Sequence, residues 1–92
     1  MRIYIAGPIT NNPNYIEQFN AAEVMLKKKG LTVHNPVKNI GFEYKDYIDM
    51  GLCELMHCDA IYLLKGWRCS KGAVLEYNYA KTVGLTIILE ES

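Results

Sequence analysis

The sequence predicts a small α/β fold, a doubly wound parallel sheet with helices on both faces, and three observations lead to this prediction. The 92 residues leave room for one domain only, since a domain usually takes about 150 residues. Short β-rich segments alternate with segments of helical periodicity along the whole chain. Glycine or proline stands at several of the junctions between them. We therefore expect a single domain that covers residues 1–92.

The first half of the chain has the pattern strand, helix, strand. Residues 2–6 form a β-rich apolar run that ends at a Gly-Pro pair, which predicts a short strand. Apolar residues at helical spacing over 15–29, with Gly30 just beyond, predict a helix that ends in a glycine cap. Residues 31–34 form a second short strand pattern, which an Asn-Pro pair ends.

The second half has the pattern helix, strand, helix, strand. A helix is expected over about 47–57, preceded by Asp46 as a possible cap. Residues 59–64 form a nearly continuous apolar run, which is typical of a strand buried on both faces. Ser70 is a favourable N-cap for a third helix over 71–83, and a last apolar strand is expected over 85–89.

This alternation fixes the expected topology and the region where a ligand would bind. Strands that alternate with helices form parallel sheets with right-handed crossovers, and helices must then cover both faces. For four strands we expect the flavodoxin-like order 2-1-3-4, in which ligands bind beyond the carboxyl ends of strands 1 and 3. The loops that reach this edge are 7–14, 35–45 and 65–70.

Composition and charge exclude several classes of function. Lys and Arg total 10 and Asp and Glu also total 10, so the basic excess of a general nucleic-acid binder is absent. The same balance argues against a polybasic membrane anchor, and no apolar run reaches the ~18 residues of a transmembrane helix. With no signal-peptide pattern and an odd count of three cysteines, we expect a reduced, cytoplasmic protein.

The start of the third helix carries the most informative side chains. Gly72 in its first turn leaves backbone N–H groups open to a ligand oxygen. Glu76 follows one turn later, beside the apolar face that Ala73 and Tyr77 begin. Partial burial would raise the pKa of this carboxylate unless a hydrogen-bond donor offset it. The alternative is a surface glutamate on an amphipathic helix.

Two further residues each allow a functional and a structural interpretation. Asp59 stands at the edge of an apolar run, and the structural alternative is a strand-start residue bonded to backbone N–H groups. Tyr4 lies in the first strand, on the face opposite Ile3 and Ile5, and the alternative is a core tyrosine.

The spacing of the cysteines and histidines does not predict a metal centre. Cys53 and His57 are four residues apart and share a helix face, which supplies only half of a zinc site. Cys58 follows directly, and we expect it to be buried as a small hydrophobic residue. We therefore predict neither a metal nor a cofactor.

The motifs taken together resemble those of the nucleoside 2-deoxyribosyltransferase superfamily. The resemblance rests on three stretches in the same order: Arg2-Ile3-Tyr4-Ile5-Ala6-Gly7-Pro8-Ile9, Cys58-Asp59-Ala60-Ile61, and Ser70-Lys71-Gly72-Ala73-x-x-Glu76. It covers nearly the whole chain, which is most similar to a small branch common in bacterial and phage genomes. The superfamily includes transferases that exchange bases on 2′-deoxyribose and hydrolases that cut the N-glycosidic bond of 2′-deoxynucleoside 5′-monophosphates.

The resemblance implies a role for each matching residue. Glu76 matches the nucleophile that attacks the anomeric carbon, Tyr4 the tyrosine that positions it, and Asp59 a carboxylate suited to proton transfer to the base. Ser70 stands where the transferases carry an aspartate and where the hydrolase branch carries a phosphate-contacting serine. The residues expected to contact substrate are Gly7, Pro8, Ile9, Trp67, Ser70 and Gly72.

The function expected on this basis is N-glycosidic bond cleavage or base exchange on a small nucleoside or nucleotide. Hydrolysis is favoured over transfer because Ser70 replaces the transferase aspartate. A non-catalytic module that binds a nucleotide on the same fold is the alternative, and an interaction domain with a vestigial pocket is the third. A chain of four strands leaves a shallow pocket, so we also expect a homodimer that completes it.

Overall fold

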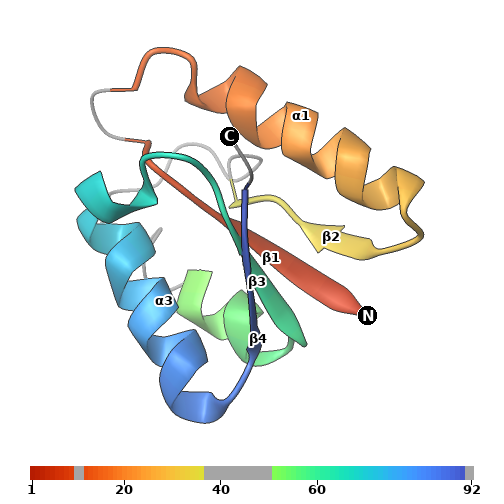
Figure 1. Ribbon diagram of the computed structural model, residues 1–92, viewed down its shortest axis with the longest axis vertical. Helices are drawn as coiled ribbons and strands as arrows, with labels where there is room; N and C mark the ends of the chain where they lie inside the picture. The colour runs from red at the N-terminus through yellow and green to blue at the C-terminus, as the bar shows by residue number, and fades with distance from the viewer. Residues whose placement is uncertain (10–11, 37–50, 91–92) are drawn as a thin grey trace.

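The computed structural model describes residues 1–9, 12–36 and 51–90, and strands and helices alternate along it (Figure 1). The elements are β1 (Arg2–Ala6), α1 (Tyr15–Lys28), β2 (Thr32–His34), a helical segment over 51–56, β3 (Ala60–Leu63), a short 3₁₀ turn η2 (Trp67–Cys69), α3 (Lys71–Val83) and β4 (Thr86–Leu89). The α/β class predicted from the alternation is confirmed.

The four strands form one parallel sheet in the order β2-β1-β3-β4, which confirms the predicted order 2-1-3-4. In the centre, Ile3 of β1 pairs with Ala60 of β3, and Tyr4 pairs with Ile61. β1 therefore lies in the middle of the sheet, with a parallel neighbour on each side, and its side chains meet helices on both faces.

The observed bounds differ from the expected ones by one residue or so at the ends of elements. β3 spans Ala60–Leu63, within the predicted 59–64, and η2 occupies part of the predicted loop. Residues 51–56 are helical, as predicted for that part of the second helix. Its predicted start and the Asp46 cap lie outside the described residues, as do residues 10–11 of the predicted loop 7–14 and most of the predicted loop 35–45.

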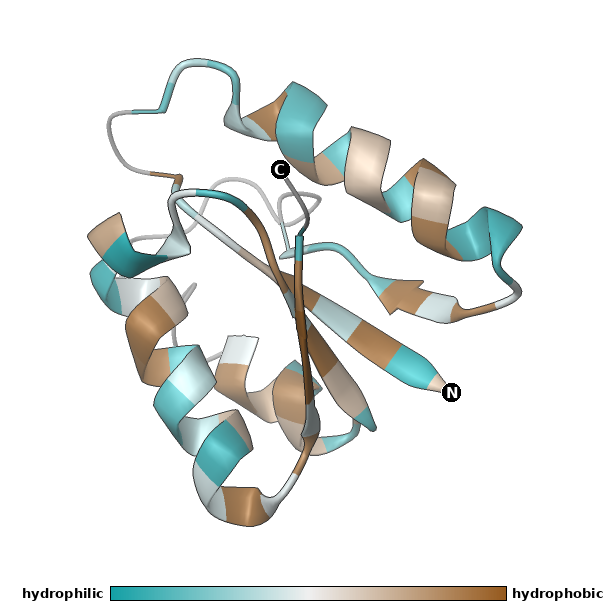
Figure 2. Cartoon of the chain, viewed as in Figure 1, coloured by the Kyte–Doolittle hydropathy of each residue, from teal (hydrophilic) through white to brown (hydrophobic). Residues whose placement is uncertain are grey.

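The two faces of the sheet carry separate cores. α1 covers one face and α3 the other (Figure 1), and α3 shares its face with Leu55 of the helical segment. Figure 2 shows the strands as largely hydrophobic elements between helices that carry both polar and hydrophobic residues. The buried residues on the α1 face are Ile3, Ile5, Phe19, Ala22, Leu26, Ala60, Tyr62 and Leu64. Those on the α3 face are Tyr4, Ala6, Leu55, Cys58, Ile61, Leu63, Ala73 and Ala80.

Local signals account for both ends of α3. The Ser70 side-chain oxygen accepts a hydrogen bond from the Ala73 N–H at 3.2 Å, which satisfies one of the free donors of the first turn. Gly84 ends the helix with φ of 85°, a left-handed conformation that glycine adopts without steric cost. Within the described part of the chain, no helix combines the length and the apolar character that crossing a membrane requires.

Candidate active site

The centre of the candidate site is a hydrogen bond between β1 and α3. The Tyr4 hydroxyl donates to Oε2 of Glu76 at 2.5 Å, joining residues 72 positions apart in the sequence. The exposed fractions are 1% for Tyr4 and 8% for Glu76, so both polar groups lie inside the protein. The predicted partnership of the two residues is therefore present as a direct contact.

Small residues on α3 explain how this contact forms. Ala73 and Ala80 are fully or almost fully buried and face the sheet, so the helix backbone can approach β1 and β3 closely. Glu76 lies three residues after Ala73 and four before Ala80, which places it on the same helix face. Strand alternation turns Tyr4 to this face, opposite Ile3 and Ile5, as predicted.

Burial decides the protonation behaviour of the pair. Desolvation raises the pKa of Glu76 from 4.5 to about 7, although the hydrogen bond from Tyr4 lowers it and the Glu54 carboxylate raises it further. Desolvation, together with the negative charge of Glu76, raises the pKa of Tyr4 well above 10. The glutamate is thus the group of the pair that titrates near neutral pH, and the tyrosine remains a hydrogen-bond donor.

Two neighbours of the pair were missed by the sequence analysis. A Cβ atom added to Gly51 would lie 2.5 Å from Oε2 of Glu76 and 2.6 Å from the Tyr4 hydroxyl oxygen. Glu54, one turn later, repels the negative forms of both Tyr4 and Glu76. A glycine inside the predicted helix over 47–57, where it costs about 1 kcal/mol relative to alanine, is a signal that could have identified this segment.

Asp59 lies at a different place from the Tyr4–Glu76 pair. Its carboxylate oxygen Oδ2 accepts a hydrogen bond from the Arg2 N–H at 2.8 Å, and its own N–H donates to the Arg2 carbonyl at 2.8 Å. Its carbonyl accepts from the Thr86 N–H at 3.1 Å. Asp59 therefore joins three strands at the amino edge of the sheet, the geometry of the structural alternative, and its role as a proton donor stays a prediction.

Gly7 and Pro8 hold the loop after β1 against the loop after β3. A Cβ on Gly7 would lie 2.8 Å from Cβ of Leu64, so the glycine is required for close packing of neighbouring backbones. Cγ of Pro8 lies 3.4 Å from the position of a Cβ on Gly66, which is ordinary van der Waals contact. Ile9 follows with 37% of its surface exposed. These contacts explain Gly7 and Pro8 structurally, and their contact with substrate stays a prediction.

A chain of side-chain amides fixes the same two loops. Asn12 Nδ2 donates to the Pro8 carbonyl at 2.9 Å and to Oε1 of Gln18 at 3.0 Å. Gln18 Nε2 then donates to the Lys65 carbonyl at 3.2 Å. The two loops at the carboxyl edges of β1 and β3 are thereby tied to each other and to the first turns of α1.

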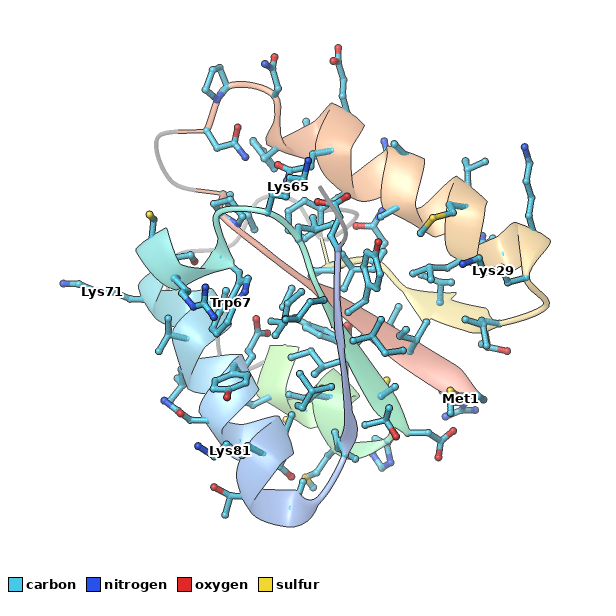
Figure 3. The ribbon with its side chains drawn as sticks, in the orientation of Figure 1. Met1, Lys29, Lys65, Trp67, Lys71 and Lys81 are labelled. Atoms are coloured by element: carbon cyan, nitrogen blue, oxygen red, sulfur yellow. The ribbon has the colours of Figure 1, made fainter. Side chains whose placement is uncertain are left out.

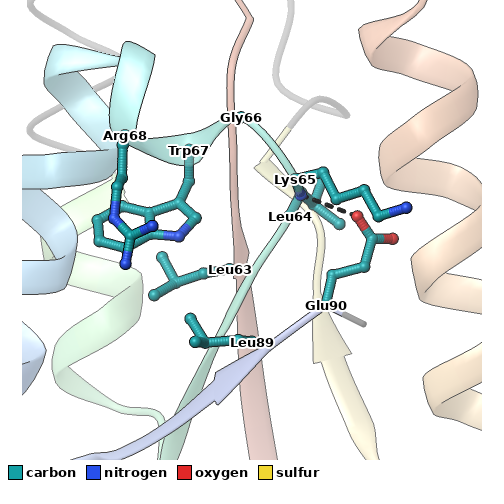
Figure 4. Close-up of a pocket in the computed structure, with 8 residues that line it drawn as sticks. All are labelled: Leu63, Leu64, Lys65, Gly66, Trp67, Arg68, Leu89 and Glu90. Atoms are coloured by element: carbon teal, nitrogen blue, oxygen red, sulfur yellow. Dashed lines mark hydrogen bonds between the residues drawn. The ribbon is translucent and has the colours of Figure 1, made fainter. Parts of the chain in front are cut away.

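Trp67 lies beside a hollow at the carboxyl ends of β3 and β4 (Figure 4). Its ring centroid is 4.7 Å from that of Tyr77, and the Arg68 guanidinium lies 5.0 Å from the Trp67 ring centroid. The hollow, of about 270 Å³, is lined by Leu63, Leu64, Lys65, Gly66, Trp67, Arg68, Leu89 and Glu90. Neither Tyr4 nor Glu76 lines this hollow. Trp67 connects the hollow to α3 through its contact with Tyr77.

Ser70 and Gly72 lie at the start of α3, as predicted. The Ser70 oxygen is engaged in the cap, while its hydroxyl hydrogen can still be donated to a ligand. Gly72 is partly exposed in the first turn. Lys71 between them extends away from the body of the protein (Figure 3), so its cation does not lie over the helix start.

Of the three cysteines in the described residues, only Cys58 is buried. Among residues 1–9, 12–36 and 51–90, no three His, Cys, Asp or Glu side chains come close enough to hold a metal ion. Cys53 is exposed, whereas Cys58 is buried and its Sγ donates to the Glu54 carbonyl at 3.4 Å. Burial, followed by the Glu54 charge, raises the pKa of the Cys58 thiol to about 11, which disfavours the reactive thiolate.

Comparisons with known proteins agree with this fold. A 2-desoxiribosyltransferase (2-deoxyribosyltransferase) from Leishmania mexicana superposes with a TM-score of 0.75 at 26% identity, over 96% of this chain and 62% of that one. The chain thus has a 2-deoxyribosyltransferase-like fold but spans less than two thirds of that protein's length. No curated protein matched the chain. A family model matches residues 1–89, and the chain therefore belongs to the family described as a domain of unknown function, DUF4406.

Proposed function

We propose that the protein acts on the N-glycosidic bond of a 2′-deoxynucleoside or its 5′-monophosphate, with Glu76 as the nucleophile. The reaction is either cleavage of this bond or exchange of the base. The observation that carries the proposal is the buried hydrogen bond between Tyr4 and Oε2 of Glu76. A carboxylate with a raised pKa, held by a fixed donor on a scaffold of this fold, suits covalent glycosyl transfer.

The proposed reaction proceeds in two displacements. A Glu76 oxygen forms a bond to the anomeric carbon while the bond from that carbon to the base nitrogen breaks, and the electron pair leaves with the base. The base takes up a proton as it departs. Water, or a second base in the exchange reaction, then attacks the same carbon and releases the Glu76 carboxylate. The sugar therefore keeps its anomeric configuration through two inversions.

The environment of Glu76 suits the nucleophile for this reaction. With a pKa of about 7, a substantial fraction of the carboxylate is ionised at neutral pH. The ionised form is held by one hydrogen bond and little solvent, so less hydration must be removed before it attacks. The Tyr4 hydroxyl fixes the orientation of the carboxylate and, with its own pKa raised, stays protonated through the reaction.

The geometry and the family resemblance disagree about which group donates a proton to the leaving base. Asp59, which the resemblance assigns to this step, bonds to the Arg2 N–H at the amino edge of the sheet. Ligands of such folds bind at the carboxyl edge instead. We therefore propose solvent water as the donor.

A small, charged substrate fits the groups near the start of α3. The Ser70 hydroxyl and the open N–H groups of the first helical turn suit a 5′-phosphate, which favours a nucleoside monophosphate and hydrolysis over transfer. A zero net charge is consistent with a small ligand held locally. A second copy of this chain is proposed to complete the site, because a sheet of four strands leaves a shallow pocket.

The decisive experiment measures release of free base. The protein is incubated with each of the four 2′-deoxynucleosides and their 5′-monophosphates, and the products are separated chromatographically. Wild type should release base, Glu76→Gln should lose roughly 1,000-fold or more of the activity, and Glu23→Gln, a second buried glutamate, should retain it. Acid-quenched wild type should also carry a deoxyribosyl group on the peptide that contains Glu76.

A non-catalytic nucleotide-binding module is the second candidate, and the position of Asp59 favours it. Asp59, the acid that the resemblance assigns to the leaving base, lies away from Glu76 and bonds to the Arg2 N–H, and a chain without this acid at the site could retain the pocket and lose the reaction. Calorimetric binding of a nucleotide that is unchanged in Glu76→Ala, with no base released by wild type, would establish this second function and overturn the first.

A further inference from the structure

We infer that Gly51 is a positioning residue for Glu76: its bare backbone lets Oε2 and the Tyr4 hydroxyl meet, and so leaves Oε1 as the attacking oxygen. The inference rests on the proposed function of Glu76. It assigns a role to a helical segment that the sequence motifs do not include.

The geometry around Gly51 leaves no space for a side chain. An ideal Cβ would lie 2.5 Å from Oε2 of Glu76 and 2.6 Å from the hydroxyl oxygen of Tyr4, both closer than carbon approaches oxygen in folded proteins. Both of these atoms are buried and bonded to each other, so neither can move aside without breaking their hydrogen bond. Gly51 is itself buried, and the backbone of this segment packs directly against the hydrogen-bonded Tyr4 and Glu76 side chains.

This packing gives the two carboxylate oxygens of Glu76 different environments. Oε2 is covered by Gly51 and accepts from Tyr4, whereas no described group donates to Oε1. A nucleophilic oxygen must be free of strong hydrogen bonds along its line of attack, which fits Oε1. An added methyl group at residue 51 would rotate the carboxylate and exchange or misalign these roles.

The test exploits two effects of Gly51→Ala that have opposite signs. Alanine is the better helix former, so the substitution would raise the melting temperature at an unconstrained helical position. If the methyl group meets the pair, the melting temperature should instead fall by roughly 5 °C or more. Cys53→Ala on the exposed side of the same segment is the matched control and should leave stability and activity near those of wild type.

Rescue separates a contact with this pair from general disruption. In a Tyr4→Phe/Glu76→Ala background both clashing oxygen atoms are absent, so adding Gly51→Ala should no longer lower the melting temperature. In the otherwise wild-type enzyme, Gly51→Ala should reduce kcat by roughly 10-fold or more while KM changes by less than about threefold, because orientation is lost rather than binding.

The stability and activity measurements test the role of Gly51 separately from the proposed function of Glu76. A Gly51→Ala variant that is more stable than wild type and fully active overturns the inference, as does an equal loss of stability in both backgrounds. The stability measurements need no activity, so a wild type that releases no base would refute the proposed function and leave the packing role of Gly51 intact.

Discussion

Two buried glutamates lie on opposite faces of the sheet, and they differ in their partners. Glu23 in α1 is 7% exposed and Glu76 in α3 is 8% exposed. Glu23 accepts from the Lys27 ammonium at 2.6 Å and from the Asn35 amide at 2.9 Å. Glu76 accepts from the neutral Tyr4 hydroxyl, and no described cation contacts it.

The comparison teaches that a buried carboxylate can be compensated either by a charged partner or by a neutral hydrogen-bond donor. Lys27, at i+4 on the same helix, supplies Glu23 with a compensating charge and has a side chain that is 57% exposed. Glu76 lies against the central strand with a partner that donates a hydrogen bond but carries no charge. Its desolvation is therefore only partly offset, and its pKa rises to about 7.

The largest expected effect is on stability as a function of pH. The pKa of Glu76 is raised from 4.5 to about 7, so the folded state binds this proton more tightly than the unfolded state. The resulting stabilisation is fully present below pH 4.5 and is lost as the pH rises through about 7. The free energy of unfolding of wild type, relative to Glu76→Gln, should therefore fall by roughly 3 kcal/mol across this range.

Urea titrations at half-unit pH intervals measure this difference. Subtracting the Glu76→Gln curve removes the contributions of all other titrating groups, because glutamine mimics the protonated acid at every pH. Cys53→Ala, exposed on another element, should run parallel to wild type. A flat difference between wild type and Glu76→Gln would mean that the pKa of Glu76 is the same in the folded and unfolded states.

The next largest effect is expected from Tyr4→Phe, which removes the donor from Glu76. A hydrogen bond to a buried charged group contributes about 2 kcal/mol, so the variant should lose about this much stability above pH 8 and less at pH 5, where Glu76 is protonated. The same bond lowers the pKa of Glu76, so the pH midpoint of base release should move upward. Tyr79→Phe, on the same helix as Glu76, is the control, and an unmoved midpoint would contradict the assignment.

The sequence was sufficient for the fold because its signals are local. Ser70 and Gly84 mark the two ends of α3 through a side-chain cap and a left-handed residue, both of which depend only on neighbouring backbone. The apolar run at β3 indicated a central strand, and alternation with helices restricted the strand order. The one-residue differences at helix and strand ends arise because terminal pairing depends on tertiary contacts.

The site was less accessible to sequence reasoning. Strand parity placed Tyr4 on the correct face, and helix spacing placed Glu76 beside an apolar face, but the pairing of the two residues came from the family resemblance. The contact with Gly51 depends on how a helix packs against a strand, which one sequence does not specify. For Asp59 a topological argument was available, since the first residue of a parallel strand lies at the amino edge, away from the ligand-binding edge.

A smaller effect is expected on the other side of the comparison, from Lys27→Met. The Lys27 side chain is 57% exposed, so solvent screens the ion pair with Glu23, and the loss of stability should be about 0.5 kcal/mol. The difference from wild type should shrink as NaCl is raised toward 1 M. Lys28→Met, adjacent on α1, is the control. A loss of several kcal/mol would show that Glu23 depends on its cation much as Glu76 depends on Tyr4.

The smallest expected effect concerns Glu54, whose negative charge is the weakest of the three causes that set the pKa of Glu76. Glu54→Gln removes the repulsion and keeps the size of the side chain, so the pKa of Glu76 should fall. The pH midpoint of base release should then move downward, opposite to the change in Tyr4→Phe, and the two shifts should combine in the double variant. Glu17→Gln in α1 removes an equal charge on the other face and should leave the midpoint in place. An upward shift in Glu54→Gln would mean that Glu54 acts on Glu76 through contacts rather than charge.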